Sequence, residues 1–285
     1  MELRTDLALE ARELKGDISG VEWDEEQFGD VTVNRMEVTS HHGADALGKP
    51  MGRYVTVTMP AFTDNSFRTD ERFETVSAEF ARLVPKDGEV LVIGLGNSRI
   101  TPDALGPKAA SQIIATRHIT GELERSCGHS QLRPCCVLAP GVLGQTGIEV
   151  LELLKAVCSS IKPAAVIVID ALASRRLERL GCTVQISDAG ISPGAGVGNN
   201  RPEISTRTLG VPVISAGVPT VVEASVLARD LIGHSSARVQ PDGRRMIVTP
   251  REIDLLIDRA ARLIALSVNS VLHPQIDPIE LLSMT

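Results

Sequence analysis

The chain has 285 residues, of which 43% are hydrophobic and 23% are charged, and its formal net charge is −7. This composition is typical of a globular protein with a sizeable core and excludes disorder over the whole length. Because aromatic residues make up only 2% and no basic run occurs, we expect neither a stacking platform nor a phosphate-tracking surface for nucleic acid. The sequence shows no signal peptide and no apolar stretch of membrane-spanning length, which predicts a cytoplasmic protein without membrane contact.

Two parts of the chain differ in pattern, and we expect them to pack as a single domain over residues 1–285. Residues 1–88 are mixed and polar, with alternating strand patterns at 31–38 and 54–59. Residues 89–285 form a βα core in which apolar runs alternate with helical patterns. These runs are continuous, as in strands that helices cover on both faces. They lie at residues 90–93, 137–139, 166–169 and 211–216, and residues 184–186 can add a short strand of either direction.

The alternation of strands and helices predicts an α/β fold with three layers, α/β/α, and a mostly parallel central sheet of the phosphorylase/hydrolase-like type. Three Thr-x-x-Glu sequences, which begin at Thr146, Thr220 and Thr249, have the form of capping boxes and predict helix starts. Residues 252–272 carry apolar side chains on one helical stripe, so we expect this last helix to cover the sheet.

Two aspartates follow apolar runs at what we expect to be one edge of the sheet. Asp103 follows residues 90–93 after a glycine-rich turn, and Asp170 directly ends the run 166–169. Ligands of open α/β sheets bind outside the carboxyl ends of the strands. Two carboxyl groups held close together cannot easily both ionise, so one keeps a proton while the other acts as a base. We therefore expect Asp103 and Asp170 to be catalytic residues that activate water.

Each aspartate also has a structural interpretation. Asp103 could favour the positive end of a helix, and Asp170 could form a turn.

Glycines in the turns at the same edge would let a substrate backbone approach closely. The residues that we expect to bind substrate are Gly94, Gly96, Asn97 and Gly141.

Other kinds of site fit the sequence less well. The turn at residues 94–97 lacks the third glycine of the dinucleotide fingerprint, and residues 194–198 are not followed by the lysine of a P-loop. The spacing of Cys127, His129, Cys135 and Cys136 matches no common zinc motif. We therefore expect neither a metal nor another cofactor. An odd number of cysteines, five, indicates reduced thiols.

A series of motifs runs through nearly the whole chain. The series includes Arg4-Thr5-Asp6-Leu7-Ala8, Gly94-Leu95-Gly96-Asn97, Gln145-Thr146-Gly147-Ile148-Glu149, Ile169-Asp170-Ala171-Leu172-Ala173 and Gly217-Val218-Pro219-Thr220. In this order the motifs resemble those of the germination proteases of spore-forming bacteria. The resemblance implies a fold related to that of the hydrogenase maturation peptidases, which have acidic residues at the positions of Asp103 and Asp170.

The resemblance further implies an endopeptidase that hydrolyses small acid-soluble spore proteins in the spore core during germination. It implies that Asp103 and Asp170 form an atypical aspartic pair, and that the protein is a homo-oligomer, a tetramer, made as a zymogen. The chain departs from the family pattern in three places. The family usually has a peptide ahead of the Arg4 motif, a long segment where this chain has residues 233–245, and a histidine at the position of Ser192.

Two classes of enzyme remain open. The first is a metal-independent endopeptidase in which Asp103 and Asp170 share a proton. The second is a metal-dependent maturation peptidase that acts on a partner protein, with the carboxylates and a further ligand holding a divalent ion. A third interpretation is a binding module without enzymatic activity, in which both aspartates are structural caps.

Overall fold

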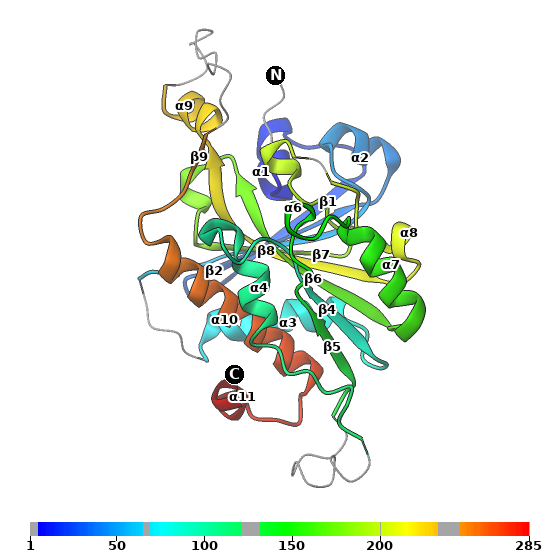
Figure 1. The fold of residues 1–285 in the computed structure, drawn as a ribbon. Helices are drawn as coiled ribbons and strands as arrows, with labels where there is room; N and C mark the ends of the chain where they lie inside the picture. Colours follow the sequence, from blue (N-terminus) through cyan, green and yellow to red (C-terminus); the bar gives the residue numbers. More distant parts are fainter. Residues whose placement is uncertain (1–4, 65–68, 121–131, 200, 233–245, 285) are drawn as a thin grey trace.

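The computed structural model describes residues 5–64, 69–120, 132–199, 201–232 and 246–284, and its strands join into one mixed sheet. The strands are β1 (Val21–Phe28), β2 (Val31–Val38), β3 (Gly52–Thr58), β4 (Val90–Gly94), β5 (Cys135–Leu138), β6 (Ala165–Ser174), β7 (Thr183–Ser187), β8 (Val213–Glu223) and β9 (Ile247–Val248). Their order in the sheet is β1-β2-β3-β7-β8-β6-β4-β5, with β9 paired to β8 (Figure 1). All the strands predicted from the sequence are present.

The sheet has a parallel half and an antiparallel half. Strands β5, β4, β6 and β8 are parallel and form the first, whereas β7, β3, β2 and β1 pair antiparallel and form the second. Within the described residues, three strand pairings are parallel and five are antiparallel, counting that of β9. The α/β class is confirmed, but the prediction of a mostly parallel sheet is wrong. The sequence pattern did not predict β1, because nearly all of its side chains are exposed and give no sustained alternation of apolar and polar residues.

Helices cover both faces of the sheet. The helices are α1 (Ala8–Lys15), α2 (His41–Leu47), α3 (Glu71–Leu83), α4 (Leu105–Ala110), α6 (Leu143–Thr146), α7 (Val150–Ile161), α8 (Thr206–Leu209), α9 (Ala224–Ile232), α10 (Ile253–Leu272) and α11 (Pro278–Met284), with 3₁₀ turns η1 (Thr101–Asp103), η2 (Leu177–Arg179) and η3 (Ala195–Val197). The largest core lies on the face of α3, α4 and α10, where Ile257 joins Val92 and Ile167. On the other face, where Figure 1 shows α7, Leu154 of α7 shares a second core with Val166. The sheet is therefore the middle of three layers.

The three predicted capping boxes do not begin helices. Thr220 lies inside β8, which continues beyond Pro219 because β6 and β8 change register there and remain paired. Helix α7 begins after Glu149 and α10 after Glu252, and neither start has a side-chain capping bond. The hydroxyl of Thr249 instead donates to the backbone oxygen of Thr220 at 2.9 Å. These threonines therefore bond to neighbouring backbone rather than cap helices.

Two further findings concern the described part of the chain. None of its helices combines the length and apolar character needed to cross a membrane. Its four cysteines, Cys135, Cys136, Cys158 and Cys182, are free thiols. Cys127, His129 and the segment 233–245 lie outside the described residues.

Candidate active site

Asp170 lies inside β6 rather than at its end. The pairing of β6 with β4 stops at Ile169, whereas its pairing with β8 continues through Asp170 to Ser174. Beyond Ile169, β6 therefore has a neighbouring strand on one side only, and the turn that follows β4 lies at the other side. Asp170 is 6% exposed, and one of its carboxyl oxygens accepts the backbone N–H of Ala171 at 2.9 Å.

The turn between β4 and α4 folds over β6 and brings Asp103 to the same place. The backbone N–H of Leu95 donates to the oxygen of Ile169 at 2.8 Å. At Gly106 a Cβ atom would lie 2.5 Å from that same oxygen, so only glycine permits this close approach. Gly96 has φ +113° and touches the backbone of Asp103. The glycines of this turn thus allow the backbone packing that places Asp103 beside the strand of Asp170.

Asp103 and Asp170 line the same cavity, whose volume is about 430 Å³. The cavity lies at the carboxyl ends of the parallel strands, where ligands of α/β sheets bind. Its walls are mostly apolar and come from segments far apart in the sequence, represented by Leu95, Val142, Leu151, Leu172, Val197 and Val221. Arg201 and Glu149, which also line it, form a partly exposed ion pair at 3.3 Å. The site thus combines the carboxyl groups of Asp103 and Asp170 with mostly apolar surroundings.

The two carboxyl groups have different environments. Burial raises the pKa of Asp170 well above its ordinary value, and the negative charges of Asp103 and Asp6 raise it further. Burial also raises the pKa of Asp103, but the N–H of Asn97, which donates to its carboxylate at 2.8 Å, opposes this shift. Asp103 is partly exposed as well. The arrangement therefore favours a proton on Asp170 and negative charge on Asp103.

The structure separates the four residues expected to bind substrate. Gly96 and Gly141 line the cavity, whereas Gly94 and Asn97 are not among its lining residues. Gly94 packs closely against the backbone of Gly106. The side-chain oxygen of Asn97 accepts a hydrogen bond from the amide of Gln145 at 2.7 Å, and its backbone N–H holds Asp103. Gly94 and Asn97 thus support the turn that carries Asp103.

Two residues at the site were missed by the sequence analysis. Asp6 lines the cavity as a fourth carboxyl group, beside Asp103, Asp170 and Glu149. Thr220 also lines it, and its hydroxyl donates to the backbone oxygen of Pro102 at 2.8 Å, which fastens the turn of Asp103 to β8. Asp6 stands in the first of the quoted motifs, but nothing in its spacing relates it to Asp103. Across the described ranges, no group of three or more His, Cys, Asp and Glu side chains is arranged to hold a metal ion.

The sequence is similar to those of germination proteases. Residues 1–237 match the family model Peptidase_A25, described as germination protease. The chain is 42% identical to the germination protease of Caldanaerobacter subterraneus subsp. tengcongensis, with 95% of this chain and 94% of that protein covered. Identity to the Priestia megaterium germination protease is 34%, with 96% and 95% covered. Among solved structures, the [NiFe] hydrogenase maturation protease HycI of Thermococcus kodakarensis KOD1 matches with a TM-score of 0.40 and 17% identity, covering 68% of this chain and 98% of that one.

Proposed function

Because the chain belongs to the germination protease family, we propose that it is an endopeptidase that degrades small acid-soluble spore proteins with Asp103 and Asp170 as its catalytic pair. One observation carries the proposal: both carboxyl groups line a single, mostly apolar cavity at the carboxyl ends of the parallel strands. The cavity has the volume of a ligand site. Its apolar walls suit the side chains of a polypeptide, and its two acids supply a proton donor and a proton acceptor.

The environments of the two carboxyl groups divide their roles. Asp103 is the base: it takes a proton from water while the water oxygen bonds to the carbonyl carbon of the scissile peptide. Asp170 is the acid: it gives its proton to the amide nitrogen as the carbon–nitrogen bond breaks. The products are a free carboxylic acid and a free amine. A proton then passes from Asp103 to Asp170, which restores the starting state of the pair.

The family also supports three further parts of the proposal: the enzyme acts in the spore core, it is a homo-oligomer, a tetramer, and it is made as a zymogen. Size-exclusion chromatography with light scattering measures the oligomeric state.

The test is cleavage of a small acid-soluble spore protein, followed by mass spectrometry. We expect Asp170→Asn and Asp103→Asn each to lower kcat/KM on the order of 10³-fold, since each removes a proton-transfer group but keeps the shape of the side chain. The control is Asp258→Asn on α10, an exposed residue paired with Lys108 at 2.5 Å, which should retain activity. A folded Asp170→Asn protein that cleaves at the wild-type rate would refute the proposal.

A chelator separates this proposal from a metal-dependent maturation peptidase. After dialysis against EDTA, an enzyme that uses the two aspartates alone should cleave at an unchanged rate. If activity is lost and a divalent ion restores it, the carboxyl groups act as metal ligands and the proposed mechanism is wrong.

A further inference from the structure

We propose that Asp6 is a positioning residue of the catalytic pair, which fixes the end of β6 and places a negative charge beside Asp170. This inference rests on the function proposed above, because it assigns Asp6 a role toward Asp103 and Asp170. Three sets of contacts support it: those of Asp6 with β6, those of the rest of the N-terminal segment with the chain beyond β6, and those of Asp6 with nearby charges.

Asp6 binds the strand that carries Asp170. Its backbone N–H donates to the oxygen of Ala173 at 2.9 Å, and its carboxylate accepts the N–H of Ala173 at 2.8 Å. The same carboxylate lies against Gly196 of η3, where a Cβ atom would collide with it. Asp6 therefore joins β6 to η3 at the wall of the cavity, beyond the point where β4 has ended.

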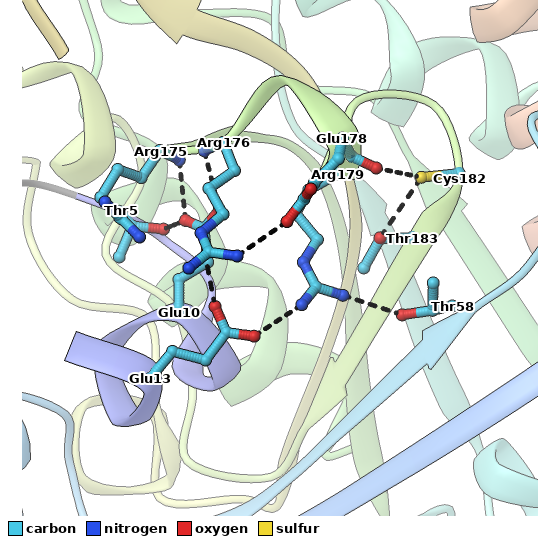
Figure 2. Close-up of polar contacts among 10 residues, drawn as sticks. All are labelled: Thr5, Glu10, Glu13, Thr58, Arg175, Arg176, Glu178, Arg179, Cys182 and Thr183. Carbon is cyan, nitrogen blue, oxygen red and sulfur yellow. Dashed lines mark hydrogen bonds and ion pairs between the residues drawn. The ribbon is translucent and has the colours of Figure 1, made fainter. Parts of the chain in front are cut away.

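Two acidic residues of α1, which follows Asp6 in the chain, contact the segment that comes after β6. The carboxylate of Glu10 accepts the backbone N–H groups of Arg175 and Arg176 at 2.7 and 2.9 Å. Glu13 pairs with Arg179 of η2 at 2.6 Å. Figure 2 shows these acidic side chains of α1 pointing toward the segment that leaves β6. We call the contacts of Asp6, Glu10 and Glu13 with residues 173–179 the N-terminal clamp.

Asp6 and Asp170 line the same cavity, so a negative charge on Asp6 opposes ionisation of Asp170. Burial raises the pKa of Asp6 and lowers the pKa of Lys49. The Lys49 ammonium donates to the backbone oxygens of Thr5 and Asp6 at 2.9 and 3.0 Å, and its charge opposes the upward shift of the Asp6 pKa. An ionised Asp6 raises the pKa of Asp170, in addition to the effect of Asp103.

Other charged groups also lie near Asp6 and Asp170. The negative charge of Glu10 raises the pKa of Lys49, and the Glu149–Arg201 ion pair lies at the cavity wall. Removing the negative charge of Asp6 makes Asp170 easier to ionise. The pH above which Asp170 loses its proton, and cleavage stops, must then fall.

The first experiment is the pH profile of kcat/KM for Asp6→Asn. The amide oxygen can still accept the N–H of Ala173, so the variant removes the charge while it keeps this bond to β6. We expect the falling, alkaline limb to move about one pH unit toward acid. The control is Asp188→Asn, because Asp188 also accepts a backbone N–H, from Arg53 at 2.6 Å, but does not line the cavity. If Asp6 had only a structural role, Asp6→Asn would lower kcat at every pH and leave the alkaline limb of the profile where it is in the wild type. That result overturns the proposal.

The second variant, Asp6→Glu, keeps the charge and displaces the carboxylate. We expect the wild-type position of the alkaline limb, with kcat about tenfold lower because the end of β6 is less well fixed. Wild-type kcat in this variant overturns the positioning role even if Asp6→Asn does not fold.

An NMR titration of the Asp170 carboxyl carbon measures the charge effect without any substrate. If Asp170→Asn keeps full activity, the proposed function is wrong; if it is inactive and Asp6→Asn shifts neither titration nor limb, only the role of Asp6 is wrong.

Discussion

The parallel and antiparallel halves of the sheet are stabilised in different ways. In the parallel half, β4 is buried throughout, and backbone packs directly on backbone around Gly106. In the antiparallel half, β1 is exposed along almost its whole length, and Arg35 of β2 forms ion pairs with Glu26 of β1 and Glu79 of α3. The tightly packed half carries the candidate active site. The comparison shows that the candidate site lies where backbone packs closely on backbone, whereas the exposed edge of the sheet is joined to its neighbours by ion pairs.

Gly106→Ala tests the packing of the parallel half and should have the largest effect on stability. The new methyl group would meet the backbone oxygens of Leu95 and Ile169, which cannot move without disturbing β4 and β6. We expect the free energy of unfolding to fall by about 3 kcal/mol. Urea denaturation measures it. Gly144→Ala is the matched control, because a Cβ atom there has no neighbour within 4 Å and should stabilise α6 slightly. Equal stability of the two variants would contradict the prediction.

His273 makes the helical layer sensitive to acid. It lies at the end of α10, is 0% exposed, and its ring nitrogens have no hydrogen-bond partner within the described residues. Burial and the charge of Arg133 lower its pKa to about 4, below the value of about 6.5 in an unfolded chain. The unfolded state therefore binds a proton first as the pH falls. Stability is lost below about pH 6.5, and the loss ends near pH 4.

The size of this effect is about 2 kcal/mol between pH 7 and pH 5. We expect His273→Leu to flatten the dependence of unfolding free energy on pH by that amount, as measured by urea denaturation at each pH. His42→Gln, which changes an exposed histidine of α2, should keep the wild-type slope. The same slope in wild type and His273→Leu would show that His273 does not control it.

Arg35→Met tests the antiparallel half and should have the smallest effect of the three. It leaves Glu79, whose side chain is 3% exposed, without its 2.6 Å partner, although Arg82 remains at 3.7 Å. We expect a loss of about 1 to 2 kcal/mol, measured by thermal or urea unfolding. Arg207→Met breaks a surface pair with Glu203 and should cost less than about 0.5 kcal/mol. If both variants lose the same free energy of unfolding, the ion pair of Arg35 stabilises the antiparallel half no more than a surface pair does, and the prediction is wrong.

The parallel half could be predicted well from the sequence, and the antiparallel half poorly. Continuous apolar runs such as residues 166–169 identify buried strands, because helices cover both faces. In β1, the exposed side chains give no such pattern. The predicted helix start at Thr220 failed for a related reason. Local capping preferences could not reveal that β6 would keep β8 extended past Pro219.

The candidate site was predictable where its residues follow neighbouring strands. Asp103 and Asp170 come to one cavity because Asp103 follows β4 and Asp170 lies in β6 just beyond the point where β4 ends. The position of Asp6 depends on contacts with Ala173 and Gly196, which no local pattern encodes. The roles of Gly94 and Asn97 were also beyond local rules, since both depend on how closely the turn packs on α4 and α6.

The N-terminal clamp has a consequence for how the protein is made. Asp6 and Ala173 are separated by 167 positions, so the clamp can form only after the chain between them has been synthesised. We therefore expect the end of β6, and with it the candidate active site, to become ordered late during synthesis.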